Sequence, residues 1–376
     1  MPHLISGLNS LAQLTPVLAR YPARRILLVT GKGSYAASGA RAHTEAALQG
    51  RSILHFYDFD VNPKIEDAQR GVALAREEGI DLILAVGGGS VLDMAKLIKA
   101  FYASPGAEKT LTQGKTPVTD PDIPLIAIPT TAGSGSEATH FAVVYLGADK
   151  YSVAAPCLLP DQVILDGSLL ASAAPYQKAC NLLDALAQAI ESAWAVGSTA
   201  ESRGYSFEAI DLIMQHARAM VQPDADSVTL QAMAEAAHLA GKAINISKTT
   251  AAHAWSYGIT GTYGIPHGHA VWLTLPAIFQ IHALADETQI NDPRGPQHLR
   301  AIMVQLMQAL SIATPDQAST TLRQFMTDIG AEPDLTKSGP DTPEKRTALS
   351  TQVNMQRMSN NPVRLSDADI QAIFDL

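Results

Sequence analysis

The sequence predicts an α/β domain followed by an all-helical domain, and each half of the chain supplies one reason. In the first half, short aliphatic runs alternate with helical patterns, which is typical of a parallel, doubly wound sheet. In the second half, helix-compatible stretches dominate and few strand-like runs remain. We therefore expect an α/β domain over residues 1–172 and a helical domain over residues 173–376.

The strands of the first domain are predicted from runs of consecutive aliphatic residues, which indicate strands buried on both faces. These runs are residues 25–30, 53–57, 82–86, 125–129 and 163–165. Helical patterns over residues 68–78 and 91–100 lie on either side of the run at 82–86. Helices between the strands are what a parallel sheet requires, because its strands are joined by crossover connections.

The helices of the second domain are predicted from six helix-compatible stretches. These stretches are residues 176–195, 202–220, 227–243, 270–283, 296–310 and 314–329. We expect Pro276 to kink or split the fourth of them, because proline removes a helical hydrogen bond. Residues 334–345 are polar and contain prolines, so we expect a surface loop there.

Composition and charge exclude several classes of protein. With 376 residues, 47% of them hydrophobic and 17% charged, the chain is long enough for two folded domains and unlike a disordered protein. A net charge of −9 and the lack of a long basic run argue against nucleic acid and anionic membranes as partners. We expect a small-molecule substrate, with a homodimer as a candidate assembly.

A cytoplasmic location is predicted from the cysteines and from the N-terminal residues. Cys157 and Cys180 are the only cysteines and form no CxxC pattern, which favours a reducing compartment. Residues 1–17 lack the basic start and continuous apolar run of a signal peptide, and other apolar runs are too short to span a bilayer. We therefore expect a cytoplasmic protein.

A glycine-rich turn follows the predicted strand at residues 82–86. Gly87, Gly88, Gly89 and Ser90 lead directly into a helical pattern, with Asp93 expected in its first turn. Glycines let backbone amides approach a ligand closely, and the start of a helix presents unpaired N–H groups, so this turn suits a pyrophosphate. The alternative is a tight strand-to-helix turn that binds nothing.

A second segment of this kind follows the predicted strand at residues 125–129. Residues 129–137 contain the hydroxyl side chains of Thr130, Thr131 and Ser134 together with two glycines. Such a run offers backbone and side-chain donors to phosphate and ribose oxygens, although it also fits a capped helix start. Two phosphate-compatible turns in one α/β domain favour dinucleotide binding.

Four residues of the second domain form a candidate metal site. Asp184 and Gln188 are four apart in a helical pattern and share one helix face, while His253 and His267 follow on later segments. One carboxylate, one amide and two imidazoles can bind a divalent ion and leave a coordination position open. Each residue alone fits a structural role equally well, and eleven histidines give many chance sets.

Taken together, these residues resemble the iron-containing (group III) alcohol dehydrogenase family, and the order and spacing of the motifs match over most of the chain. The motifs are Gly87-Gly88-Gly89-Ser90 with Asp93 and Lys96, residues 129–137 with Thr139, Asp184-Ala185-Leu186, His253, Pro266-His267-Gly268, and Asn361-Pro362. The resemblance implies a Rossmann-like N-terminal domain and a helical C-terminal domain, the dehydroquinate synthase-like fold, with the active site between them.

The same resemblance implies a set of metal ligands for Fe²⁺ or Zn²⁺. Asp184, His253 and His267 correspond to three ligands of the family. The remaining family ligand is a histidine four residues after the aspartate, and this chain has Gln188 there. An amide oxygen is a harder ligand than imidazole, so we expect it to weaken the binding of borderline divalent metals.

Three further residues take their expected roles from the resemblance. Lys150 corresponds to the lysine that reaches the ribose of NAD or NADP, and its alternative is an exposed surface lysine. Tyr257 occupies a position where family members often have a histidine that helps proton transfer, whereas a phenol has an ordinary pKa of about 10. Gly31 stands where members that prefer NAD often have an aspartate, which repels the 2′-phosphate of NADP. Because glycine removes that repulsion and Lys32 or Ser34 would meet the phosphate, we favour NADPH.

Within the family the chain resembles the phosphonoacetaldehyde reductase (2-hydroxyethylphosphonate dehydrogenase) branch, through residues 139–141 and 240–250 and the pair Asp184 and Gln188. Lys248 precedes two threonines and the metal-ligand candidate His253, and a cation beside hydroxyl groups suits a phosphonate, sulfonate or carboxylate. The alternative is a solvated lysine followed by threonines that cap a helix.

The resulting hypothesis is the metal-dependent, NAD(P)H-linked reduction of a small anionic aldehyde, with phosphonoacetaldehyde to 2-hydroxyethylphosphonate as the leading candidate. The metal would act as a Lewis acid on the aldehyde oxygen while the nicotinamide donates hydride. The alternatives are a general alcohol dehydrogenase, a sugar-phosphate cyclase or lyase of the dehydroquinate synthase type, and a non-catalytic binding protein, which only Gln188 favours.

Overall fold

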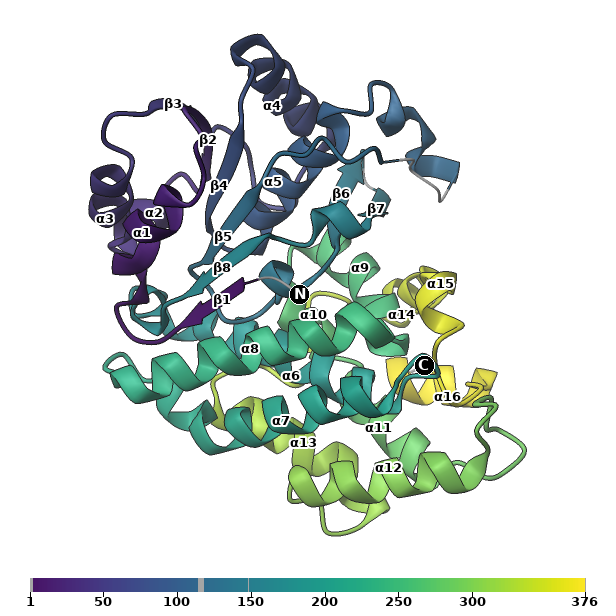
Figure 1. Ribbon diagram of the computed structural model, residues 1–376. Helices are drawn as coiled ribbons and strands as arrows, with labels where there is room; N and C mark the ends of the chain where they lie inside the picture. Colours follow the sequence, from purple (N-terminus) through teal and green to yellow (C-terminus); the bar gives the residue numbers. More distant parts are fainter. Residues whose placement is uncertain (1–2, 114–117, 148, 376) are drawn as a thin grey trace. The chain divides into compact units, whose positions relative to one another are not determined.

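The computed structural model describes residues 3–113, 118–147 and 149–375 (Figure 1). Contacts divide the chain into two compact units. The first unit contains the residues up to Ala173 together with Asp226–His238, and the second contains Ala174–Ala225 and the residues from Leu239 onward. The boundary near residue 172 remains our proposal for the domain division, and the contacts add one later segment to the first unit.

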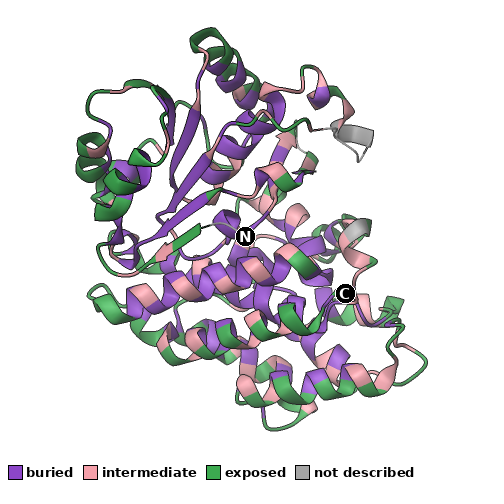
Figure 2. Ribbon diagram, in the orientation of Figure 1, coloured by how far each residue is buried: buried purple, intermediate pink, exposed green. Residues whose placement is uncertain are grey.

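A parallel sheet forms the centre of the first unit. In the described residues it has six strands in the order β1-β8-β5-β4-β2-β3, all paired in parallel. The strands are β1 (His3–Ser6), β2 (Arg25–Thr30), β3 (Ser52–Phe56), β4 (Leu82–Gly87), β5 (Leu125–Pro129) and β8 (Gln162–Leu165). Every residue of β4, β5 and β8 is buried, as Figure 2 shows, because helices cover both faces of an all-parallel sheet.

Helices and a separate hairpin complete the first unit. The helices are α1 (Leu14–Ala19), α2 (Ser34–Ala37), α3 (Ala40–Ala47), α4 (Ile65–Glu78) and α5 (Gly89–Tyr102). The helix α5 packs on β4 and β2, and Leu14, Val17 and Leu18 of α1 belong to a core cluster with Ile26 and Leu28 of β2. The hairpin consists of β6 (Phe141–Leu146) and β7 (Asp149–Ala154), which pair in antiparallel fashion.

The second unit is built from helices. They are α6 (Pro175–Trp194), α7 (Ala200–Met220), the later part of α8 (Ser227–Ser247), α9 (Ala251–Tyr263), α10 (His267–Trp272), α11 (Leu275–Leu284), α12 (Pro296–Ala309), α13 (Ala318–Asp328), α14 (Pro343–Thr351), α15 (Met355–Met358) and α16 (Asp367–Phe374). The helix α6 is buried along most of its length and starts with proline at its first position, where a missing N–H costs nothing. Within the part of the chain that the structure describes, no helix is both long and apolar enough to cross a membrane.

The predicted fold class, an α/β domain with a parallel sheet and a helical second domain, is confirmed. The five predicted strands occur within one residue of their expected limits. Three strands were not predicted: β1, whose residues are largely exposed, and the hairpin strands β6 and β7, whose burial alternates or is partial.

Two predictions for the second half meet different outcomes. The stretch at 270–283 is split as expected: α10 ends at Trp272, and α11 begins at Leu275 with Pro276 in its first turn. The predicted loop at 334–345 is wrong at its end, because α14 begins at Pro343. The Thr342 side chain caps this helix by accepting a hydrogen bond from the Lys345 amide at 3.4 Å.

Candidate metal and cofactor sites

The helix α6 carries three buried polar side chains on one face. Asp184, Gln188 and Glu191 follow one another at spacings of four and three residues, which places them along the same side of the helix. Their exposed fractions are 7%, 4% and 0%. The Gln188 Nε2 atom donates a hydrogen bond to Asp184 Oδ1 at 3.0 Å. This polar face is the foundation of the candidate metal site.

A glycine allows the segment with His267 to approach this face. A Cβ atom on Gly268 would collide with the carbonyl oxygen of Cys180 and would lie 2.6 Å from the Asp184 amide nitrogen. Only a residue without a side chain lets the first turn of α10 lie this close to the α6 backbone. His267, the first residue of α10, is thereby held beside Asp184.

Asp184, His253 and His267 come together as a cluster. One potential ligand atom from each lies within 4.8 Å of the others. His253 Nε2 lies 3.5 Å from Asp184 Oδ1, and the two imidazole rings are 5.4 Å apart between centroids. His253 Nε2 is buried and has no hydrogen-bond partner among the described residues. A buried imidazole nitrogen of this kind, next to a carboxylate and a second imidazole, fits a divalent metal ion.

The electrostatics of the cluster favour a positive charge within it. Burial raises the pKa of Asp184, but the imidazoles of His253, at 3.5 Å, and of His267 outweigh it, so this pKa lies below its usual value. Burial lowers the pKa of His253, but the Glu191 and Asp184 carboxylates outweigh it and raise the pKa to about 9. The Asp184 carboxylate therefore remains charged and stabilises a cation beside it.

Two residues around the cluster were not predicted from the sequence. Glu191 contacts His253 Nδ1 and the backbone at the start of α9. Ser256 donates a hydrogen bond to the His253 carbonyl oxygen at 2.9 Å, and its Oγ lies 3.4 Å from His267 Nδ1. The helical spacing from Asp184 identifies Glu191, since it is a charged residue on the ligand face of an otherwise apolar helix end.

Of the two residues predicted to act on substrate, Tyr257 contacts a residue of the cluster and Lys248 lies on a neighbouring loop. The Tyr257 ring stacks beside His267 with a centroid distance of 6.1 Å and an interplanar angle of 28°. Lys248 lies between α8 and α9 with a left-handed backbone (φ 63°), and Asn360 Nδ2 holds this segment by donating to the carbonyls of Ser247 and Thr249. Tyr257 is thus a direct neighbour of a ligand candidate, whereas Lys248 is held on the loop that precedes α9.

The charge and the neighbours of Lys248 bear on the expected anion site. Burial, followed by the charge of Arg357, lowers the pKa of Lys248 to about 8. The expected contribution of Thr250 is wrong: its hydroxyl accepts from Trp194 Nε1 at 2.9 Å and donates to Glu191 Oε1 at 2.7 Å, in a fully buried position. The anion site stays a prediction, for which Lys248 remains a candidate with the charge of Arg357 nearby.

The two predicted glycine-rich turns lie side by side at the carboxyl ends of β4 and β5. Gly87 pairs with Pro129, and the Thr130 amide donates to the Gly87 carbonyl oxygen at 3.0 Å. A Cβ on Gly89 would lie 2.6 Å from Ser134 Oγ, and one on Gly88 would lie 3.2 Å from the side chain of Thr131. The glycines therefore make room for the second turn.

Several donors at these turns are available to a ligand, and others are engaged. The α5 helix starts after Gly88 without a side-chain cap, so its first amides are not satisfied by a capping side chain. The buried Thr130 hydroxyl makes no hydrogen bond with the described residues. Ser90 Oγ accepts from the Asn62 amide at 3.2 Å, and Ser134 Oγ accepts from the Ser136 amide at 3.3 Å.

Asp93 and Lys96 hold the segment that follows the second turn. Asp93 accepts from Ser136 Oγ at 2.6 Å and from the Val143 amide at 3.1 Å, so both of its carboxylate oxygens are engaged. The Lys96 ammonium donates to the Thr139 carbonyl oxygen at 2.7 Å, and burial lowers its pKa to about 8. The cofactor contact of Asp93 stays a prediction, and its contacts in the structure indicate a positioning role for the segment after the second turn.

The remaining cofactor candidates lie at the ends of β2 and in β7. A Cβ on Gly31 would collide with Ser34 Oγ. Lys32 forms ion pairs with Asp60 at 3.2 Å and with Asp58 at 3.5 Å, so its charge is already balanced and supports a 2′-phosphate less than the sequence predicted. Lys150 lies in β7, and its charge acts on Asp93.

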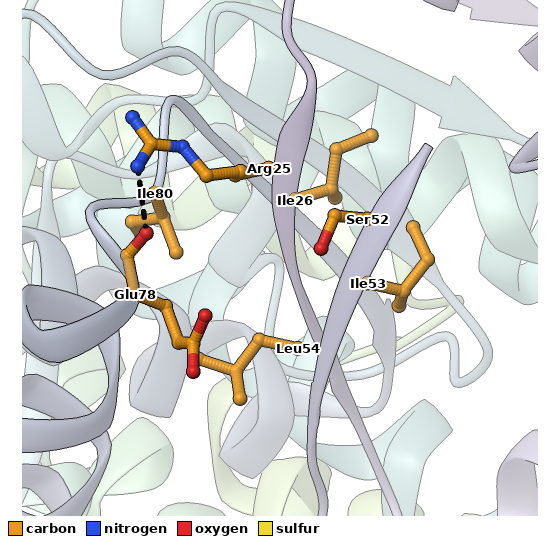
Figure 3. Close-up of a pocket in the computed structure, with 7 residues that line it drawn as sticks. All are labelled: Arg25, Ile26, Ser52, Ile53, Leu54, Glu78 and Ile80. Carbon is orange, nitrogen blue, oxygen red and sulfur yellow. Dashed lines mark hydrogen bonds between the residues drawn. The ribbon is translucent and has the colours of Figure 1, made fainter. Parts of the chain in front are cut away.

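A small pocket of about 130 Å³ lies at the opposite end of the sheet (Figure 3). It is lined by residues where β2 and β3 begin and by the turn that leads from α4 to β4. Arg25 lies over it and donates to the Glu78 carbonyl oxygen at 3.0 Å. Because parallel strands start at one edge and end at the other, this pocket is remote from both glycine-rich turns.

Comparisons with known proteins show the family of the chain. The family model "iron-containing alcohol dehydrogenase" matches residues 2–167, and the model of the C-terminal part of that family matches residues 178–376. The chain is 31% identical to phosphonoacetaldehyde reductase of Streptomyces viridochromogenes over 380 aligned residues, which cover 96% of this chain and 92% of that protein. It is 29% identical to long-chain-alcohol dehydrogenase 1 of Geobacillus thermodenitrificans, covering 98% and 93%.

A solved structure shares the fold over the whole chain. It is the crystal structure of sulfoacetaldehyde reductase from Bifidobacterium kashiwanohense in complex with NAD⁺, with a TM-score of 0.86. The match covers 100% of this chain and 96% of that chain at 24% sequence identity. At this identity the likeness concerns the fold, which both chains build from an α/β part and a helical part.

Proposed function

This chain belongs to the iron-containing alcohol dehydrogenase family, a family of oxidoreductases, and from that premise we propose that it reduces a small anionic aldehyde to the alcohol. The proposed reaction uses NADH or NADPH and a divalent metal ion, either Fe²⁺ or Zn²⁺. The leading substrate candidate is phosphonoacetaldehyde, with 2-hydroxyethylphosphonate as the product.

One observation carries the proposal: Asp184, His253 and His267 present their ligand atoms within 4.8 Å of one another, with Asp184 and His253 buried and His267 partly exposed. A divalent ion supplies Lewis-acid polarisation of a carbonyl, and a reduced nicotinamide supplies hydride. Asp184 provides the negative charge, and the buried Nε2 of His253 provides an imidazole lone pair. A catalytic metal site of this kind keeps a coordination position open for substrate.

Gln188 would be the fourth ligand, through its amide oxygen. Its Nε2 atom donates to Asp184, and an amide binds metal through oxygen. Because oxygen is harder than an imidazole nitrogen, the site should hold Fe²⁺ or Zn²⁺ less tightly than a site with a histidine at this position. Tyr257, beside His267, is our candidate for proton transfer to the product oxygen.

The anionic substrate is proposed from charge. Arg357 is close enough for its charge to lower the pKa of Lys248, and Lys248 is partly buried. Two cations close together in a partly desolvated setting are stabilised by an anion, and a phosphonate carries enough negative charge for both. The identity to phosphonoacetaldehyde reductase supports this substrate over a neutral aldehyde.

The dinucleotide would bind at the two glycine-rich turns through Gly88, Gly89, Ser90, Thr130 and Thr131. The α5 N-terminus presents amides suited to a pyrophosphate. Further contacts are proposed for Gly31, Asp93, Ser134 and Lys150. The choice between NAD and NADP is a matter for measurement, since the ion pairs of Lys32 remove one argument for NADPH.

We also propose that the enzyme is cytoplasmic and a homodimer. Both cysteines, Cys157 and Cys180, are free thiols, as a reducing compartment requires. Burial is the largest of the effects that raise the pKa of both thiols, which keeps them protonated and unreactive at neutral pH. Light scattering of the purified protein measures the assembly directly.

The test of this function is a set of initial rates of NADH and NADPH oxidation. The protein is stripped of metal, reloaded with Fe²⁺ or Zn²⁺, and assayed with phosphonoacetaldehyde, sulfoacetaldehyde and propanal. We expect turnover only after metal loading, with kcat/KM higher for the two anionic aldehydes. Full activity of the stripped protein would contradict the metal chemistry, and a preference for propanal would contradict the anionic substrate.

A further inference from the structure

Glu191 is a fully buried carboxylate that is not itself among the ligand candidates. Its side chain extends from α6, seven residues after Asp184, and its exposed fraction is 0%. Burying an ionised carboxylate is costly unless its oxygens are hydrogen-bonded. The partners of the two oxygens therefore show why a charge is kept in this position.

One oxygen of Glu191 binds the start of α9. Oε1 accepts from the amides of Ala252 at 2.9 Å, Thr250 at 3.2 Å and His253 at 3.4 Å, and from the Thr250 hydroxyl at 2.7 Å. Thr250 is the N-cap residue of α9, yet its own side chain makes no capping hydrogen bond. A carboxylate from another helix thus satisfies the amides at this helix start and complements its dipole.

The other oxygen of Glu191 binds the imidazole of His253. Oε2 is hydrogen-bonded to His253 Nδ1. An ionised carboxylate only accepts hydrogen bonds, so Nδ1 must carry a proton. The second ring nitrogen, Nε2, then faces Asp184 at 3.5 Å and has no hydrogen-bond partner among the described residues. The same side chain therefore positions the α9 backbone and the ring that this backbone carries.

We propose that Glu191 is the positioning residue of the metal site, fixing the tautomer and the orientation of His253 so that Nε2 is the ligand atom. This inference rests on the proposed function, because it assigns a role toward the same metal ion. A partner that holds the second nitrogen of a ligating histidine sets which nitrogen binds metal and how tightly it binds.

An amide at position 191 cannot do both tasks. In Glu191→Gln, one atom accepts hydrogen bonds and the other donates them. If the oxygen faces the α9 amides, the NH₂ group faces Nδ1, which must then accept and leave its proton on Nε2. If the oxygen faces Nδ1, the NH₂ group points at several N–H donors and weakens the helix start. In either orientation the ligand atom is lost or displaced.

The experiment measures metal affinity and not only turnover. Metal-free parent and Glu191→Gln proteins are titrated with Zn²⁺ in competition with a chromogenic chelator, and their unfolding is followed by circular dichroism. We expect the variant to bind Zn²⁺ about 10- to 100-fold more weakly than the parent. Glu137→Gln is the matched control, since Glu137 is also buried and its Oε1 lies 3.2 Å from His238 Nδ1 in the other unit. Its Zn²⁺ affinity should equal that of the parent.

The outcomes separate this inference from the proposed function. A parent protein that binds no Zn²⁺ or Fe²⁺ overturns the proposed metal function together with this inference. Equal Zn²⁺ affinity of the parent and Glu191→Gln overturns the positioning role alone. Equal weakening in Glu191→Gln and Glu137→Gln also overturns it, because the effect would then be general to buried carboxylates.

A second measurement needs no variant at position 191 and remains decisive if Glu191→Gln does not fold. Histidine is labelled with ¹⁵N in the Zn²⁺-loaded parent, and the His253 signals are assigned by their absence in His253→Asn. We expect Nδ1 to be protonated and Nε2 to carry the shift of a metal-bound nitrogen. The opposite assignment, with Nδ1 unprotonated, overturns the inference.

Discussion

Replacing Gly268 with alanine tests whether close backbone contact assembles the metal ligands. The new Cβ would overlap the Cys180 carbonyl oxygen and would lie 2.6 Å from the Asp184 amide nitrogen and 2.8 Å from its Cβ. Ordinary carbon contacts are about 3.5–4.0 Å, so the start of α10 has to move by roughly 1 Å. Cys180 and Asp184 are backbone contacts on a buried helix, so the movement falls on α10 and on His267.

The displacement should affect both stability and the ligands. Overpacking of this kind costs about 1–3 kcal/mol of unfolding free energy, which lowers the melting temperature by about 2–4 °C per kcal/mol for a unit of this size. A shift of about 1 Å far exceeds the roughly 0.2 Å tolerance of metal–ligand distances, so Zn²⁺ affinity should also fall. The assays are thermal unfolding of the metal-free protein and chelator-competed Zn²⁺ titration.

Gly261→Ala is the control for this variant. Gly261 lies in α9 of the same unit, and a Cβ there would meet no atom within 4 Å. Alanine in a helix is favoured over glycine by about 1 kcal/mol, so Gly261→Ala should be neutral or stabilising, with unchanged Zn²⁺ affinity. If Gly268→Ala unfolds at the parent temperature and binds Zn²⁺ like the parent, the close approach of α10 to α6 is not what holds His267.

Four further predictions concern substrate, metal and cofactor. Lys248→Ala should lower kcat/KM for anionic aldehydes by a factor that corresponds to about 1.5–3 kcal/mol, the usual value for a hydrogen bond to a charged group. Its kcat/KM for propanal should stay near the parent value, and the control Lys242→Ala should match the parent with both kinds of aldehyde. Burial and Arg357 lower the pKa of Lys248 to about 8, so the charged form of Lys248 is present below pH 8. The kcat/KM of the parent for anionic aldehydes should therefore fall as the pH rises through 8. The same pH profile in Lys248→Ala would contradict this. Gln188→His should bind Fe²⁺ and Zn²⁺ more tightly in chelator competition, and metal loss in the variant would place residue 188 outside the site. Gly31→Asp should shift the kcat/KM ratio towards NADH, and an unchanged ratio, or the same shift in Gly31→Ala, would show that a carboxylate there does not meet the ribose.

The parts of the fold that the sequence predicted are those where burial is uniform. Residues 25–30 and 82–86 are rich in aliphatic residues because their strands are buried on both faces, whereas a loop or a surface helix would place polar residues within such a run. The hairpin strands β6 and β7 bury only some of their residues, so polar and apolar positions mix over short lengths. The start of α14 was missed because Thr342-Pro343 serves equally well in a turn and as a helix cap.

In the candidate site, the sequence predicted residues by their chemical type but not the tertiary contacts that they make. Asp184, His253 and His267 were proposed from their chemistry and from family resemblance, and the structure brings them together. The roles of Glu191 and Thr250 depend on which partners reach them across tertiary structure. Spacing places Glu191 on the ligand face, but its hydrogen bonds to α9 join residues about sixty apart in the chain. Such contacts have no periodic signature in one sequence.

The hydrogen bonds that enclose the Lys96 side chain make the reactivity of this lysine a measure of local opening. Its side chain is 0% exposed, and its ammonium donates to carbonyl oxygens of the segment that follows the second glycine-rich turn. An amine-reactive acylating reagent can reach it only when that segment detaches from α5, whereas an exposed amine such as that of Lys32 is accessible without such opening. The acylation rate of Lys96, measured by mass spectrometry of peptides, therefore reports how often this segment opens in the native protein.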